Sequence, residues 1–73
     1  MITLTRIDPA RHMARYYHLS IQPDLFGGFQ LIRQWGPIDA QGGQERREFY
    51  LQEDDAANRL AALAATKRGR GYH

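Results

Sequence analysis

Hydrophobic residues change their spacing once along this chain, and that change limits the folds it can adopt. In residues 14–22 they alternate, so that Tyr17, Leu19 and Ile21 share one face, which is the period of a half-buried strand. From about Glu53 they follow the spacing of a helix. The pattern predicts an α+β fold, in which a small twisted antiparallel β-sheet carries one long C-terminal helix packed on one face.

Alternation and turn residues predict four strands. They are residues 2–7, 14–22, 29–35 and 44–51, the first being an edge strand. A turn is expected at residues 8–11, and Gly27-Gly28 gives the backbone the freedom that a tight connection needs. Because proline has no amide hydrogen, Gly36-Pro37 is expected to interrupt pairing after the third strand, with a hairpin tip at residues 39–43.

The same alternation assigns side chains of the last two strands to faces. In the third strand, Phe29, Leu31, Arg33 and Trp35 fall on a common side. In the fourth, Arg47, Phe49 and Leu51 point one way and Arg46, Glu48 and Tyr50 the other. Such a mixture is typical of a sheet with one covered face and one face in water.

The helix is predicted from about Glu53 to Gly69. Acidic residues fill its first turn and Lys67-Arg68 its last, which suits the helix dipole, and glycine is a common C-terminal stop. Its buried stripe is predicted to consist of Ala56, Leu60, Leu63, Ala64 and Lys67. Since this stripe is made mostly of small residues, the helix is expected to lie close to the sheet.

A chain of 73 residues without cysteine predicts one domain, residues 1–73, with a modest core and no disulfides. No apolar run is long enough for a signal peptide or a membrane span, so a soluble, cytoplasmic protein is expected. The net charge of +2 is unevenly distributed: both ends of the chain are basic and the middle, residues 24–55, is acidic.

Residues that carry chemistry are sparse. His12, His18 and His73 lack the spacing of metal ligands, and the only serine, Ser20, has no identifiable partner. The glycines match neither a phosphate-binding loop nor a dinucleotide fingerprint. We therefore predict no catalytic residues, no metal, no cofactor and no enzymatic activity.

One stretch of the chain resembles a known family. Gly27-Gly28 precedes a strand that ends in Trp35-Gly36, with the aromatic pair Tyr16-Tyr17 before it and Gly42-Gly43 and Phe49 after it. Together with the Ala/Leu-rich helix and the final Gly71-Tyr72, this order resembles the WGR domain, a nucleic-acid-binding module named for a Trp-Gly-Arg motif. The resemblance covers residues 2–72, but Pro37 stands where the family has its arginine.

The resemblance implies roles for several residues. In WGR domains of poly(ADP-ribose) polymerases the motif tryptophan packs against a nucleotide at a DNA end, which assigns that role to Trp35; the alternative is that Trp35 fills the core. Arg33 matches an arginine common in the family and is expected either to contact phosphate or to pair with an acid such as Glu48. The cation missing at Pro37 would have to come from Arg46 or Arg47.

The basic tail has two interpretations. Lys67, Arg68 and Arg70 suit a phosphate backbone, but cations at the end of a helix also serve as ordinary capping residues. Tyr72 is expected to be a packing anchor rather than a stacking platform.

Two functions follow. The first is a stand-alone WGR-like module that binds nucleic acid, with duplex DNA the preferred partner and its ends or nicks the preferred sites. The alternative is a protein interaction or homo-oligomerisation module without significant DNA binding, which the acidic middle segment and the missing arginine favour. Short free-standing copies of this kind resemble bacterial ones, so a bacterial source is expected.

Overall fold

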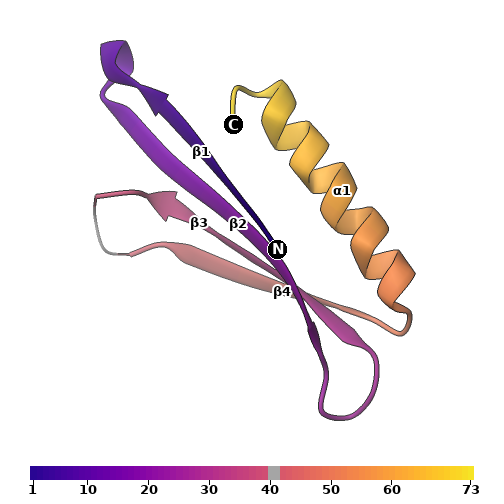
Figure 1. Ribbon diagram of the computed structural model, residues 1–73. Helices are drawn as coiled ribbons and strands as arrows, with labels where there is room; N and C mark the ends of the chain where they lie inside the picture. The colour runs from indigo at the N-terminus through magenta and orange to yellow at the C-terminus, as the bar shows by residue number, and fades with distance from the viewer. Residues whose placement is uncertain (40–41) are drawn as a thin grey trace.

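A computed structural model describes residues 1–39 and 42–73. The strands, the 3-10 turn η1 and the helix are β1 (Ile2–Asp8), η1 (Pro9–Arg11), β2 (Met13–Pro23), β3 (Phe29–Pro37), β4 (Gln44–Tyr50) and α1 (Glu53–Gly69). The strands form one antiparallel sheet in the order β1-β2-β3-β4. Figure 1 shows the twisted sheet with α1 crossing one side of it. The predicted α+β fold is therefore confirmed.

The core lies between α1 and one face of the sheet. Leu19 and Leu31 are completely buried there, and Tyr17 is 2% exposed. From the helix, Leu60, Leu63 and Ala64 pack against them. We call this side of the sheet, which carries Tyr17, Leu19, Leu31, Arg33 and Trp35, the helix face; the side that carries His18, Ser20, Ile32 and Gln34 is the open face.

Four residues of the predicted stripe, Ala56, Leu60, Leu63 and Ala64, are buried, with Ala56 and Ala64 at 0% and 1% exposure, whereas Lys67 is only partly buried. Small side chains at these positions let the helix backbone approach the strands, while each buried leucine contributes about 1.5–3 kcal/mol of hydrophobic stabilisation. This helix is too short and too polar to span a membrane, and no other α-helix occurs among the described residues.

The turn between β2 and β3 confirms the expected tight connection. Gly27 and Gly28 adopt φ values of 95° and 79°, which are open to glycine at little cost. The carboxylate of Asp24 accepts hydrogen bonds from the Phe26 amide (2.9 Å) and from the Gln30 side chain (2.8 Å). This fixed turn holds the side chains of Leu25 and Phe26 in solvent, each 97% exposed.

The expectation that pairing stops at Gly36-Pro37 holds for the pairing with β4 but is wrong for the pairing with β2. Strand β3 continues through Pro37, which lies opposite Arg15 on β2, and the Ile38 amide then donates to the Ala14 carbonyl at 3.0 Å. The pairing of β3 with β4 already ends at Trp35. Proline is therefore tolerated, because at this point the strand has a partner on one side only and the missing amide leaves no ladder bond unmade. The predicted hairpin tip includes residues 40 and 41, which lie outside the described residues.

The helix ends at Gly69, as predicted, but Gly69 is not the residue that reverses the chain. Gly69 is still helical, and Gly71, with φ of 96°, is the residue that reverses the chain. The amides of Gly71 and Tyr72 donate to the carbonyls of Arg68 and Lys67, both at 3.1 Å, which is the Schellman pattern. His73 and Thr5 then exchange two backbone hydrogen bonds of 2.8 and 2.9 Å, which join the end of the chain to β1.

Candidate nucleic-acid interface

Trp35 stands at the edge of the core, on an aromatic layer. It lies directly opposite Tyr17 across β2 and β3, and the two rings stack with centroids 5.8 Å apart and planes 17° apart. Tyr72 meets Tyr17 edge-on at 6.3 Å and is 9% exposed, so its predicted role as a packing anchor is confirmed. Trp35 itself is only partly buried against this cluster.

The uncovered part of Trp35 lines a groove. The groove has a volume of about 310 Å³ and is bordered by Arg15, Trp35, Gly36, Pro37, Gly42, Gln44 and Tyr72. The ring packs on the core and also borders open space, so Trp35 is a core residue in part, and its contact with a nucleotide stays a prediction. A groove of this size accommodates one flat ring or sugar beside the indole.

Glycine is required at position 36 because two segments of the chain approach each other closely beside the groove. A Cβ atom at Gly36 would lie 2.8 Å from the Cα atom of Gly43. One at Gly43 would lie 2.5 Å from the Tyr16 hydroxyl and 3.0 Å from the Trp35 carbonyl oxygen. Glycine at both positions therefore lets the chain close beside Trp35, which explains physically why glycine follows the tryptophan.

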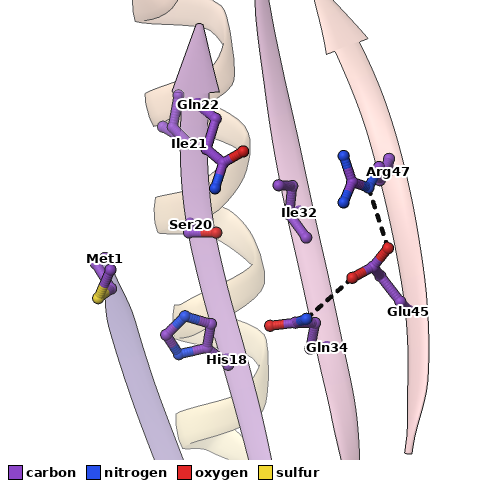
Figure 2. A pocket seen from close by; sticks show the side chains of 9 residues that line it. All are labelled: Met1, His18, Ser20, Ile21, Gln22, Ile32, Gln34, Glu45 and Arg47. Atoms are coloured by element: carbon purple, nitrogen blue, oxygen red, sulfur yellow. Dashed lines mark hydrogen bonds and ion pairs between the residues drawn. The ribbon is translucent and has the colours of Figure 1, made fainter.

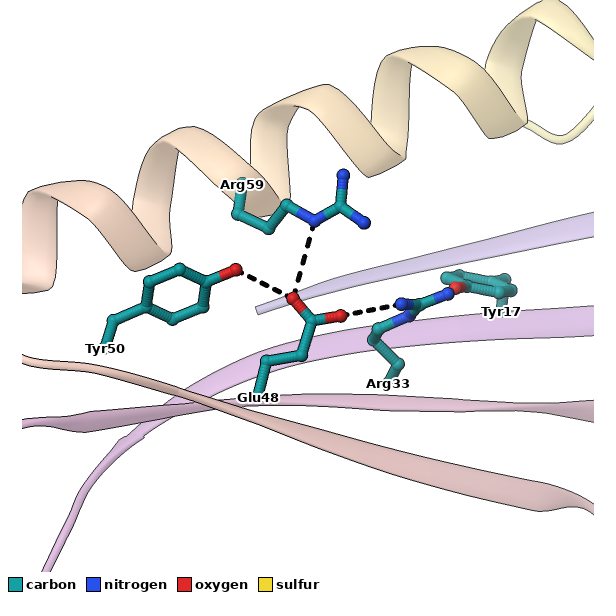
Figure 3. Close-up of polar contacts among 5 residues, drawn as sticks. All are labelled: Tyr17, Arg33, Glu48, Tyr50 and Arg59. Carbon is teal, nitrogen blue, oxygen red and sulfur yellow. Dashed lines mark hydrogen bonds and ion pairs between the residues drawn. The ribbon is translucent and has the colours of Figure 1, made fainter.

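Arg33 is held beneath the aromatic layer by a polar network (Figure 3). Its Nε donates to the Tyr17 hydroxyl at 3.0 Å and its Nη1 to Glu48 at 2.7 Å, while its guanidinium carbon lies 5.7 Å from the centre of the Trp35 ring. Glu48 also accepts hydrogen bonds from Tyr50 (2.7 Å) and Arg59 (3.4 Å). Of the two roles expected for Arg33, the ion pair with Glu48 is thus present in the structure.

Comparison with known proteins decides the family. The family model described as "WGR domain" matches residues 1–73. The chain belongs to the WGR family. It is 48% identical over 67 residues to "Uncharacterized protein y4dW" from the bacterium Sinorhizobium fredii (strain NBRC 101917 / NGR234), which covers 92% of the chain and 32% of the relative, so the chain spans about a third of that protein's length. No solved structure matches the chain.

Membership of the WGR family indicates a binding domain rather than a catalytic one, and nucleic acid as the class of ligand. Among residues 1–39 and 42–73, no group of three or more His, Asp or Glu side chains is placed to hold a metal ion.

Charges inside this WGR domain are stabilised by their neighbours. Burial alone would lower the pKa of Arg33, but its hydrogen bonds to Glu48 and Tyr17 prevail and raise that pKa above its ordinary value. Burial alone would likewise raise the pKa of Glu48, but the hydrogen bonds from Tyr50 and Arg33 prevail and lower it. Both groups stay charged at neutral pH, so Arg33 is a fixed cation with its main donors engaged.

Lys67 joins the helix end to the aromatic layer of the WGR fold. Its Nζ lies 4.5 Å from the centre of the Tyr17 ring and 5.7 Å from that of Tyr72. Burial, together with the positive charges of Arg70 and Arg33, lowers the pKa of Lys67. Arg68 and Arg70 are exposed on the same helix end. Both roles weighed for the tail remain open here, since Lys67 packs within the fold and also adds a cation near the groove.

Arg46 and Arg47 lie on opposite faces of the WGR sheet. Arg46 is directly opposite Arg33, on the helix face. Arg47 is opposite Ile32, where it donates to Glu45 (3.0 Å) and Gln30 (3.1 Å). Arg47 lines a pocket of about 290 Å³. Figure 2 shows the side chains of this pocket, with Arg47 beside Glu45. The structure therefore does not bring Arg47 together with Trp35.

Arg15 lines the groove beside Trp35, although it was not among the residues predicted for the site. Arg15 is exposed and lies directly opposite Pro37 on the helix face. Alternation in β2 already places it on the same side as Tyr17. Only the register that pairs Tyr17 with Trp35 puts Arg15 beside the Trp-Gly pair, and that register is a property of the folded sheet.

Proposed function

We propose that this WGR domain binds duplex DNA through the groove beside Trp35, with ends or nicks as the preferred sites. The observation that carries the proposal is the placement of a partly exposed tryptophan, supported by Tyr17, on a groove that Arg15 lines, with Lys67 packed on the adjoining rings of Tyr17 and Tyr72. The cations proposed to contact phosphates with it are Arg15, Arg46, Lys67, Arg68 and Arg70, and none of them forms an ion pair with a described residue.

The shape of the groove favours an interrupted duplex over a continuous one. Inside a continuous duplex the base pairs cover each other's faces, whereas an end or a nick exposes a terminal base and its sugar. Trp35 presents a flat apolar surface that can pack on such a group, and stacking of this kind is largely independent of sequence. The surrounding lysine and arginine side chains would then contact the phosphates on either side.

The distribution of charge along α1 supports the same orientation. Glu53, Asp54 and Asp55 occupy the first turn of the helix, whereas Lys67 and Arg68 occupy the last. A helix of 17 residues is about 25 Å long, so these acids lie far from the groove. The basic end of the helix thus faces the proposed ligand, and the modest net charge of the chain does not weaken the local attraction.

Titration with a short blunt DNA duplex tests the proposal, because Trp35 is the only tryptophan of the chain and its fluorescence reports on the groove. We expect quenching, and an affinity that falls steeply with salt. If about four cations contact phosphates, the logarithm of the binding constant falls by about 3–4 for each tenfold rise in salt. Closed circular DNA is expected to compete poorly. No spectral change at low salt would contradict the proposal, and equal competition by circular DNA would remove the preference for ends.

A second function, contact with a protein or with another copy of the chain, is favoured by one observation. The tip of the β2–β3 turn displays Leu25 and Phe26, and Phe49 nearby is 56% exposed. Paired large apolar side chains in solvent are typical of interaction sites. The tip is separated from Trp35 by six residues of β3, or about 20 Å, so the two surfaces are distinct.

If this second function is correct, light scattering at micromolar concentration is expected to show that the wild-type chain is a dimer. The double variant Leu25→Ser, Phe26→Ser is expected to be a monomer. Removing two exposed apolar groups from the contact is the physical reason. The double variant retains Asp24 and both glycines of the turn, so its fold and its DNA titration serve as controls. A monomeric wild-type protein would count against self-association through the tip.

A further inference from the structure

Two arginines lie side by side on the helix face of the sheet without a counter-charge. Arg6 of β1 and Arg15 of β2 are direct cross-strand partners, so their side chains leave the same face at adjacent positions. Like charges in this arrangement are unfavourable. Neither guanidinium forms an ion pair or a side-chain hydrogen bond within the described part of the chain.

The surroundings add positive charge rather than cancel it. Arg6 is half-buried and packs against the reversing residue of the helix end, where a Cβ atom on Gly71 would meet its Nε at 3.4 Å. The same helix end carries Lys67 and Arg70. The acid nearest along β1 on this face, Asp8, pairs with Arg11 at 3.7 Å. The fold therefore keeps a cluster of cations together beside the groove, which an anion would stabilise.

Arg15 also occupies a particular place relative to Pro37. The WGR motif would place an arginine at position 37, on the helix face, and Arg15 is the residue directly opposite that position. Arg46 lies opposite Arg33, four residues or about 13 Å along β3 from Pro37, and Arg47 is on the other face. Of these arginines, Arg15 is the one that brings a guanidinium to the end of the groove where Pro37 stands in place of the motif arginine.

We propose that Arg15, with Arg6 behind it, binds a phosphate group of the nucleic acid held in the groove, and replaces across the strands the cation lost at Pro37. This inference rests on the proposed function. A guanidinium presents paired donors that match two oxygens of one phosphate, and a bound phosphate removes the repulsion between the two arginines. The ligand class is a phosphodiester or terminal phosphate of DNA.

The test measures binding of a labelled DNA duplex by three variants at several salt concentrations. Arg15→Ala is expected to weaken binding about tenfold and to reduce the slope of log affinity against log salt by about one. Arg11→Ala is the matched control, since Arg11 lies in the same hairpin but is already paired with Asp8, and its effect is expected to stay within about twofold. Arg15→Ala combined with Pro37→Arg is expected to restore the affinity and the slope.

A thermal melt of the free variants separates binding from folding. Arg15 is exposed and faces a like charge, so Arg15→Ala is expected to melt at or above the temperature of the wild type. If the wild type binds the duplex and Arg15→Ala binds it equally well, this inference is overturned and the proposed function stands. Loss of affinity without rescue by Pro37→Arg would overturn the equivalence of the two positions. If the wild type itself does not bind the duplex, the proposed function fails instead.

Discussion

Trp35→Ala is expected to weaken binding of a short DNA duplex by about tenfold or more, and to remove the preference for the ends of a linear duplex over closed circular DNA. Stacking of a base or sugar on an aromatic side chain contributes about 1–3 kcal/mol, and Trp35 provides the largest flat surface of the groove. The remaining cations would still attract phosphates. We therefore expect the salt dependence of the variant to stay close to that of the wild type, measured by the anisotropy of labelled DNA.

The stability of this variant must be measured in parallel, because Trp35 also packs on Tyr17 and partly covers the core. We expect a loss of about 1–3 kcal/mol in the free energy of unfolding, which leaves the domain folded. Trp35→Phe keeps an aromatic ring and is expected to retain most of the affinity. A folded Trp35→Ala variant that binds DNA normally would exclude the groove as the contact, and an unfolded one would show that Trp35 is primarily a core residue.

Local periodicity was sufficient to predict the architecture. Alternation placed Tyr17 and Leu19 on one face, and both prove to be buried under the helix. Helical spacing selected Leu60 and Leu63, which meet them. These predictions succeeded because each depends only on which side of a strand or helix a residue occupies, and that is fixed by residues close in the sequence.

The errors arose where neighbours distant in the sequence decide the outcome. Pro37 was expected to end a strand, but the strand continues because its amide position faces no partner there. Gly69 was expected to end the helix and is its last residue, but the positive φ that reverses the chain lies at Gly71, since the tail must turn back for His73 to pair with Thr5. In each case the residue type correctly indicated that the regular structure changes nearby, but contacts with residues distant in the sequence determine the exact position of the change.

The same distinction applies to where the residues of the candidate site lie. Trp35 was selected by its resemblance to a family motif, and the structure places it on a groove. Arg15 was missed because its place there depends on the register between β2 and β3. Arg46 and Arg47 were treated as equivalent, although adjacent strand residues point to opposite faces and only one of them shares a face with Trp35.

Glu48→Ala is expected to lower the free energy of unfolding by about 2–3 kcal/mol, a large part of the roughly 4–11 kcal/mol typical for 73 residues. The side chains of Glu48 and Arg33 are only 20% and 17% exposed. The variant therefore leaves the Arg33 guanidinium largely buried without the carboxylate that neutralises its charge. It also removes the acceptor for Tyr50. Urea unfolding followed by Trp35 fluorescence measures the loss. Glu45→Ala is the matched control, because its ion pair with Arg47 on the same strand is exposed to solvent and little change is expected.

The pH dependence of the same unfolding curves identifies the charge of Glu48 as the cause. Its pKa in the folded state is below the ordinary value of 4.5, so the carboxylate stabilises the fold above that pH, and this contribution is lost as the pH falls through the folded pKa. The wild type is therefore expected to lose more stability below pH 4.5 than Glu48→Gln does. Parallel acid limbs for the two proteins would contradict this assignment. Because either substitution frees Arg33, DNA affinity at neutral pH is expected to be maintained or to rise, whereas a fall would show that the network positions Trp35 for binding.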